Sequence, residues 1–245
     1  FNCACPVQGL YLMRHNITGS LKRRIAGFAW LVKNKLRPIA VNKLGISVTL
    51  TGTGMAFPWH VISSVSVGHG NIVEDMQLGI DCTLSGFAPV FCEQAVVYSE
   101  FPEQVDAEKT QRTRWEHGHL LTIGQQVPRL MKAAIARKDW RLFALALDIG
   151  VPPLSLLVML STAGLVFLGI VSLLIKSYVT FNILIVSFLF FLMMICVTWW
   201  VSGRNYFTWK ELLKIPIYII SKVYIYIGFF FKPQREWVKT RRDLK

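Results

Sequence analysis

Residues 149–175 read IGVPPLSLLVMLSTAGLVFLGIVSLLI and contain no Asp, Glu, Lys or Arg. Residues 177–203 form a second run of the same length, again without any of these four residue types. A helix that crosses the hydrocarbon of a bilayer needs about 20 apolar residues. Both runs are long enough, and neither has the polar face that a soluble surface helix would show. They predict a hairpin of two transmembrane helices over residues 148–203.

Lysine and arginine are distributed unevenly around these two runs. Only Lys176 lies between them, whereas basic residues flank them on both outer sides: Arg129, Lys132, Arg137, Lys138 and Arg141 before, and Arg204, Lys210 and Lys214 after. Cytoplasmic loops of membrane proteins carry an excess of basic residues. The pattern predicts an integral membrane protein whose N-terminal portion and C-terminal tail are cytoplasmic.

The whole chain combines 53% hydrophobic residues with a formal net charge of +13. A basic surface is also typical of nucleic-acid binding, but nucleic-acid binding gives no reason for long uncharged runs. A bilayer with anionic headgroups explains both properties. We therefore expect the lipid bilayer as a partner and no nucleic acid.

Two other apolar segments carry charge. Residues 215–231 have Lys222 near their middle and precede a basic tail, residues 232–245, which would lie outside if the segment crossed the bilayer. We expect residues 204–231 to contain an interfacial or re-entrant helix, with a third membrane helix as the alternative. Residues 126–147 mix basic and apolar side chains, which predicts an amphipathic interfacial helix region, or else an ordinary surface helix of the soluble domain.

Residues 1–125 have a mixed composition with several glycine turns. ISVTLTGTGMAF (46–57) predicts a strand that ends in such a turn. EDMQLGIDCTLSG (74–86) predicts a helix, and APVFCEQAVVY (88–98) predicts a following strand. Strand, helix and strand in this order indicate a cytoplasmic α/β domain.

Three short motifs follow one another in this domain: GTGMAF (52–57), VEDMQLG (73–79) and QRTRW (111–115). Each has an ordinary explanation: a turn, a helix start where Glu74 and Asp75 complement the dipole, and a basic helix with Trp115 as an interfacial anchor. In this order, before a hydrophobic hairpin, they resemble the catalytic half of the membrane-integrated family 2 glycosyltransferases. That group includes the cellulose and hyaluronan synthases, and the resemblance covers nearly the whole chain.

The resemblance implies part of a GT-A nucleotide-sugar fold and an inverting glycosyltransferase. Such an enzyme moves a sugar from a nucleotide-sugar donor to a growing polysaccharide or a lipid-linked acceptor. One carboxylate must remove the proton of the attacking hydroxyl. By resemblance Asp75 is this catalytic base and Glu74 contacts substrate beside it. The family often has Thr where this chain has Val73, a departure that leaves the carboxylate in place.

The same resemblance assigns the remaining motif residues to substrate binding. Arg114, helped by Arg112, would stabilise the departing diphosphate through bidentate hydrogen bonds. Trp115 would hold the terminal sugar of the acceptor, with Gln111 hydrogen-bonding nearby. The turn beside the acceptor would be formed by three residues whose small size lets backbone approach the substrate: Gly52, Thr53 and Gly54.

The sequence lacks one part of the family pattern. Family members carry a D-x-D that holds Mg²⁺ or Mn²⁺ on the diphosphate, whereas the first acidic residue here is Glu74 and no D-x-D occurs. We expect a divalent cation in the full-length enzyme, with ligands outside this chain. His117 and His119 would diverge on a helix and complete no metal site.

The missing D-x-D leaves the character of the chain open. It predicts a C-terminal fragment that is inactive alone, with a degenerate relative as the alternative. Two functions compete with the enzyme: a non-catalytic membrane scaffold or accessory subunit of a polysaccharide-synthesis complex, and a basic peripheral membrane adaptor without sugar chemistry.

Overall fold

The computed structural model describes residues 4–14, 20–66, 73–102, 104–231 and 233. The chain divides into two compact units. We call them the sheet unit and the helical unit. The sheet unit comprises residues 1–15, 29–152 and 224–245, and the helical unit comprises residues 16–28 and 153–223.

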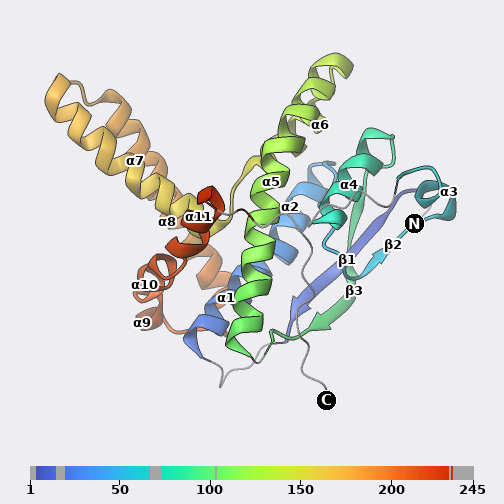
Figure 1. The fold of residues 1–245 in the computed structure, drawn as a ribbon, viewed down its shortest axis with the longest axis horizontal. Coiled ribbons are helices and arrows are strands. Elements are labelled where there is room, and N and C mark those ends of the chain that lie inside the picture. The colour runs from blue at the N-terminus through green and yellow to red at the C-terminus, as the bar shows by residue number, and fades with distance from the viewer. Residues whose placement is uncertain (1–3, 15–19, 67–72, 103, 232, 234–245) are drawn as a thin grey trace. The chain divides into compact units, whose positions relative to one another are not determined.

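The sheet unit is built on three strands in the order β2-β1-β3 (Figure 1). β1 (Val7–Met13) pairs in parallel with β3 (Val90–Ser99) and antiparallel with the short β2 (Met55–Ala56). The β1–β3 register shifts after Gly9, where β3 bulges. A Cβ on Gly9 would lie 2.6 Å from the carbonyl oxygen of Ala95. Only glycine therefore lets the bulged strand approach this closely.

Helices surround these strands. α1 (Leu21–Leu31) leads into a π-helical turn, η1 (Val32–Leu36), and then into α2 (Arg37–Lys43). α3 (Trp59–Ile62) and α4 (Glu74–Leu84) lie between β2 and β3 in sequence. α5 (Val105–Arg137) and α6 (Trp140–Gly150) follow β3.

A buried cluster joins α4, α5 and α6. α5 ends at Lys138, which has a left-handed φ of +50°, and the Asp139 side chain then caps α6 by accepting from the Arg141 N–H at 2.8 Å. The apolar side chains that meet in the cluster include Met76, Ile80, Leu130, Ala134, Leu142, Leu145, Ala146 and Ile149. Burying these side chains fixes α4, and with it the start of that helix at Glu74, against the long α5.

The apolar residues of the 126–147 segment point in two directions. Leu130 and Leu142 are buried in the cluster just described. Ile135, Trp140 and Phe143 are exposed, with 75%, 59% and 44% of their surfaces accessible. The α5–α6 hairpin therefore contributes to the core of the sheet unit and also presents apolar side chains outward.

The predicted α/β domain followed by apolar helices is confirmed. The predicted helix at 74–86 is α4, and the predicted strand at 88–98 is β3. The predicted strand at 46–57 is wrong in extent, because only Met55–Ala56 forms a strand. Gly52 and Gly54 have φ of +76° and +72°, and these left-handed conformations turn the chain between residues 46–51 and the strand at Met55–Ala56.

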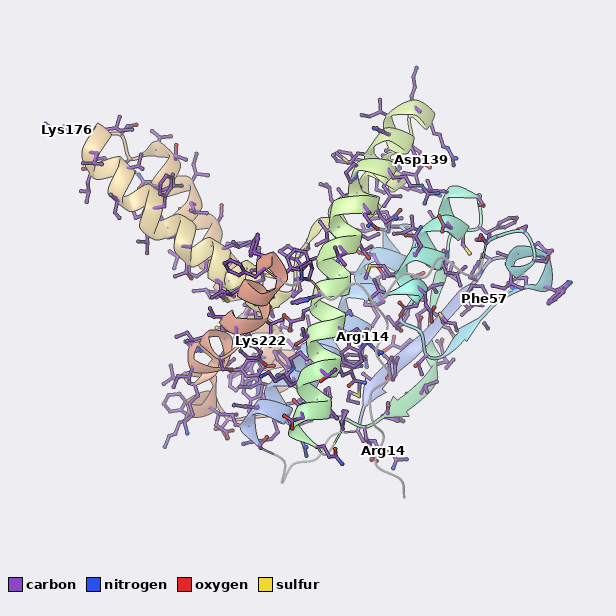
Figure 2. The ribbon with its side chains drawn as sticks, in the orientation of Figure 1. Arg14, Phe57, Arg114, Asp139, Lys176 and Lys222 are labelled. Carbon is purple, nitrogen blue, oxygen red and sulfur yellow. The ribbon has the colours of Figure 1, made fainter. Side chains whose placement is uncertain are left out.

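The helical unit contains the two uncharged runs. α7 (Leu154–Ile175) is followed by α8 (Val179–Thr198) and a π-helical turn, η2 (Trp199–Gly203). α7 and α8 form a hairpin, and Lys176 lies at its tip (Figure 2). In the part of the chain that the structure describes, three helical stretches have the length and composition to cross a membrane: residues 154–175, 179–203 and 209–231.

The third of these stretches is divided into short helices. It consists of α9 (Trp209–Leu212), α10 (Ile215–Ile220) and α11 (Val223–Phe231). The break before α11 contains Lys222, whose ammonium donates to the Ser155 hydroxyl at 3.2 Å.

Candidate active site

The turn at residues 52–54 is held by the side chain of Gln8. Gln8 lies in β1 and is buried, with 2% of its surface exposed. Its amide nitrogen donates to the carbonyl oxygens of Thr53 (2.9 Å) and Gly9 (2.8 Å), and its amide oxygen accepts from the backbone N–H of Thr51 (2.9 Å). A buried amide with three such bonds fixes the conformation of the turn, because each bond would be costly to lose.

Asp75 faces this turn from the first turn of α4. A Cβ placed on Gly52 would lie 3.1 Å from Asp75 Oδ2. The other carboxylate oxygen, Oδ1, accepts from the backbone N–H of Met76 at 2.9 Å. Glu74 is exposed, and the helix begins after Val73 without a side-chain capping bond. The structure therefore places the Asp75 carboxylate beside the glycine turn. Neither Glu74 nor Asp75 is the N-cap residue of α4.

The surroundings of Asp75 act on its pKa in opposite directions. Burial raises the pKa of Asp75 and is the largest effect, and the charge of Glu74 adds to it. The N–H of Met76 and the ammonium of Lys33 lower the pKa. The net result is a pKa above the ordinary value of an aspartate. A carboxylate of raised pKa is a stronger proton acceptor than an ordinary one.

Arg114 lies on α5 (Figure 2), and its guanidinium interacts electrostatically with the same carboxylate. Gln111, Arg114 and Trp115 share one face of this helix because they are three and four residues apart. Burial lowers the pKa of Arg114, whereas the carboxylates of Asp75 and Glu74 raise it. A guanidinium stays charged at neutral pH despite such a shift. α5 thus places a cation within the electrostatic reach of Asp75.

Arg112 is directed elsewhere. Two residues along an α-helix separate side chains by roughly 160° around the axis, so Arg112 and Arg114 lie on nearly opposite faces of α5. The Arg112 guanidinium forms an ion pair with Glu108, one turn earlier on the same helix. The structure does not bring Arg112 together with Asp75.

Trp115 is half-buried against another tryptophan. The rings of Trp115 and Trp30 have centroids 5.1 Å apart and planes inclined by 41°. Trp30 is itself held by Tyr11, because its indole N–H donates to the Tyr11 carbonyl at 3.1 Å and the two rings meet edge to face. This stack orients Trp115 from one side and leaves part of its surface accessible.

His117 and His119 contact different parts of the chain. His117 is buried, and its Nε2 lies 2.8 Å from the carbonyl oxygen of Ile225 in α11, while its ring packs on Phe229. His119 Nε2 lies 3.4 Å from the carbonyl oxygen of Ile149. Burial lowers the pKa of His119 to about 3, and the positive charges of Lys33 and Arg37 add to this effect. His119 is therefore neutral at physiological pH.

The arrangement of the motifs can be compared with known families. A family model described as glycosyl transferase family group 2 matches residues 7–202, which is most of the chain. The chain belongs to this glycosyltransferase family. Comparison with curated proteins finds no match. The matched range includes the glycine turn, the start of α4 and the α5 motif, so the resemblance to a family 2 glycosyltransferase is confirmed at the level of the family.

The residues described in this glycosyltransferase do not fit the divalent cation that the resemblance implies. Among them, no group of three or more His, Cys, Asp or Glu side chains is placed to hold a metal ion. Glu74, the first acidic residue of the sequence, is exposed beside Asp75.

The motifs missed residues that build the site of this glycosyltransferase. Gln8, Trp30 and Lys33 lie outside all three motifs, although they hold the turn, support Trp115 and act on Asp75. A signal existed for Gln8, because a glutamine in the otherwise apolar strand VQGLYLM is the kind of buried polar residue that needs partners. For Trp30 and Lys33 the sequence contains no comparable signal.

We expect Gly52→Ala to lower the transfer rate of this glycosyltransferase. The added methyl would lie 3.1 Å from Asp75 Oδ2 and would crowd the carboxylate. The φ of +76° also strains an L residue by about 1–2 kcal/mol. Sugar incorporation and thermal unfolding of the detergent-solubilised protein would be measured for both the parent and the variant.

Gly86→Ala is the matched control for this substitution. Gly86 has φ of +91°, and among the described residues no heavy atom lies within 4 Å of a Cβ added there. Both variants carry a comparable backbone strain, so we expect similar losses of thermal stability but a loss of transfer only in Gly52→Ala. Equal transfer rates in the two variants would contradict the contact between Gly52 and Asp75.

Proposed function

We propose that this chain carries the acceptor side of an inverting glycosyltransferase of the polysaccharide-synthase type, similar to cellulose and hyaluronan synthases. An acceptor hydroxyl oxygen attacks the anomeric carbon of the donor sugar. The bond between that carbon and the diphosphate oxygen breaks on the opposite face. The hydroxyl proton passes to Asp75, and the nucleoside diphosphate leaves with the bonding electron pair.

One observation carries this proposal: the carboxylate of Asp75, with its raised pKa, lies against the Gly52 turn and within the field of Arg114. A base must reach the acceptor hydroxyl, and the glycine turn provides room for the acceptor next to the carboxylate. Arg114 is the cation suited to the charge that develops on the diphosphate, because its planar guanidinium forms bidentate bonds with phosphate oxygens.

Trp115 supplies a surface for the acceptor in this proposal. Its ring is backed by Trp30, so the indole is held in a defined orientation. A flat apolar ring of this kind can lie against the apolar face of a sugar. Gln111, one turn earlier on the same face of α5, is placed to hydrogen-bond to that sugar. Glu74, exposed beside Asp75, would contact the acceptor from the start of α4.

Incorporation of a radiolabelled nucleotide sugar by membranes tests the function. The protein would be expressed from its complete open reading frame, and a panel of nucleotide sugars would be offered with Mg²⁺ or Mn²⁺, since we expect residues outside this chain to hold the divalent cation. The proposal expects label in polymer or in lipid-linked product. Label no higher than in membranes without the protein, for every donor, would support a non-catalytic scaffold instead.

We also propose a membrane arrangement for the helices. α7 and α8 would span the bilayer, and α11 would lie at the cytoplasmic interface with the α5–α6 hairpin. The outward side chains of Ile135, Trp140 and Phe143 support interfacial contact of that hairpin, because Trp and other large apolar residues are favoured at the level of the headgroups.

This arrangement predicts the side of the membrane on which the hairpin tip lies. A Ser177→Cys variant should react with a membrane-impermeant thiol reagent in intact cells, because residue 177 follows Lys176 at the tip (Figure 2). Ser85→Cys, exposed at the end of α4, should react only after permeabilisation. The parent protein gives the background labelling. Reaction of Ser177→Cys only after permeabilisation would reverse the proposed orientation.

A further inference from the structure

A small cavity is bordered by the chain neighbours of Gly52 and Asp75. Its volume is about 30 Å³, which is room for roughly one water molecule. Its wall includes Thr51 and Met76, the chain neighbours of those two residues. Lys33 and Asn34 line it from η1, and the rest of the wall includes Arg37, Thr49, His119, Asp148 and Ile149.

The π-helical turn η1 presents two polar residues to this cavity. Single π-helical turns interrupt longer helices most often at functional sites. Asn34 is buried, with 3% of its surface exposed, and neither atom of its amide has a hydrogen-bond partner among the described residues. A buried amide in that state indicates a polar environment that takes up water or another polar group. Most of the exposed lining of the cavity is apolar, and Lys33 and Asn34 are among its polar residues.

Lys33 is the cation that approaches Asp75 from this side. Its ammonium lies 5.7 Å from the centroid of the Trp30 ring, and Trp30 in turn packs on Trp115. Arg37, the other cation of the cavity, is ion-paired with Asp148 at 2.7 Å. Lys33 thus approaches the Trp30 ring, and its charge also acts on the carboxylate of Asp75.

Charged and titratable groups reach this location from four elements. Burial lowers the pKa of Lys33; Asp75 raises it and is the carboxylate with the larger effect, Arg37 lowers it, and Glu116 raises it. The Lys33 side chain as a whole is exposed, so solvent reaches part of it. The groups that face Lys33 or Asp75 are Arg37 from α2, Glu74 from α4, Arg114, Glu116 and His119 from α5, and Asp148 from α6.

We propose that Lys33 is a positioning residue for sugar transfer, whose ammonium keeps Asp75 in its carboxylate form. The inference rests on the proposed role of Asp75 as base. Burial and the like charge of Glu74 both favour the protonated form of Asp75, and the charge of Lys33 opposes them. Without Lys33 this opposing effect is lost. A protonated Asp75 cannot accept the proton of the acceptor hydroxyl.

The pH dependence of kcat/KM tests this role. The acidic limb of that profile reports the pKa of the essential base in the free enzyme. Removing the positive charge of Lys33 raises the pKa of Asp75, so activity is lost at a higher pH than in the parent. We expect Lys33→Met and Lys33→Gln to move the acidic limb upward by about one pH unit, and Lys33→Arg to leave it in place. At a pH well above the limb, the rates of all three should approach that of the parent.

Lys35→Met is the matched control. Lys35 lies on the same π-helical turn but forms an ion pair with Glu93 of β3 at 3.2 Å, away from the cavity lining. Its profile should match that of the parent. A fall in kcat/KM that is equal at every pH in Lys33→Met and Lys33→Gln, or an acidic limb that does not move, would overturn the role of Lys33.

Asp75→Asn in the same assay separates the two levels of the proposal. If Asp75→Asn is inactive and the limb does not move in the Lys33 variants, only the role of Lys33 fails. If Asp75→Asn keeps its activity, the proposed base itself is wrong, and the inference about Lys33 fails with it.

Discussion

Asp75→Asn is expected to abolish sugar transfer while the protein still inserts into the membrane. The substitution keeps the shape of the side chain and its contact with the Gly52 turn. It removes the ability to accept a proton, and general bases contribute about 10²–10⁴-fold to enzymatic rates. We expect a loss in kcat of that size, measured as radiolabelled sugar incorporated per amount of membrane-inserted protein.

Asp106→Asn provides the comparison for Asp75→Asn. Asp106 is an exposed aspartate in the first turn of α5, so its replacement changes charge without reaching the site. Carbonate extraction would show whether each variant is inserted as the parent is. Parent-like transfer by Asp75→Asn would exclude Asp75 as the base, whereas a loss shared with Asp106→Asn would indicate a general effect of charge removal.

Arg114→Ala is expected to lower kcat by about 10²–10³-fold, the usual loss when one donor to a developing negative charge is removed. Arg114→Lys should recover only part of the rate, because an ammonium is a point charge without the bidentate fork. The effect should fall mainly on kcat, since the negative charge on the departing diphosphate grows in the transition state. Steady-state kinetics with varied nucleotide sugar would measure both parameters.

Arg112→Ala distinguishes the two arginines of the QRTRW motif. Arg112 is paired with Glu108 on the far side of α5, so its removal should cost less than about fivefold, as for other ion pairs near a surface. A loss as large as that of Arg114→Ala would show that Arg112 also acts on the substrate, as the resemblance implies.

The motifs predicted the residues at the centre of the candidate site but not those that support them. Asp75 and Arg114 could be expected near each other because the order of the motifs resembles a family whose reaction needs a base and a cation together. The supports depend on tertiary contacts: Gln8 reaches the glycine turn across more than 40 residues of chain, and Trp30 reaches Trp115 across more than 80. Such pairings follow from the sheet register and helix packing, which leave no local pattern in the sequence.

One local prediction was wrong for a physical reason. The strand expected at 46–57 is interrupted, because the glycines that mark its end also turn the chain before Met55 joins the sheet. The two arginines of QRTRW lie on nearly opposite faces of a helix because they are two residues apart. The shared role that the resemblance gives them stays a prediction. Helical periodicity decides which side chains meet.

The hydrogen bond between His117 and the Ile225 carbonyl, at 2.8 Å, has a consequence for how this chain can change in length. Arg114 and Trp115 lie within one helical turn of His117 on α5. One inserted or deleted residue between Trp115 and His117 would turn the two groups by about 100° and shift them by about 1.5 Å relative to each other. Side chains in this stretch can therefore be exchanged, but its length cannot change without loss of one of two interactions. These are the electrostatic interaction of Arg114 with Asp75 and the hydrogen bond of His117 to α11.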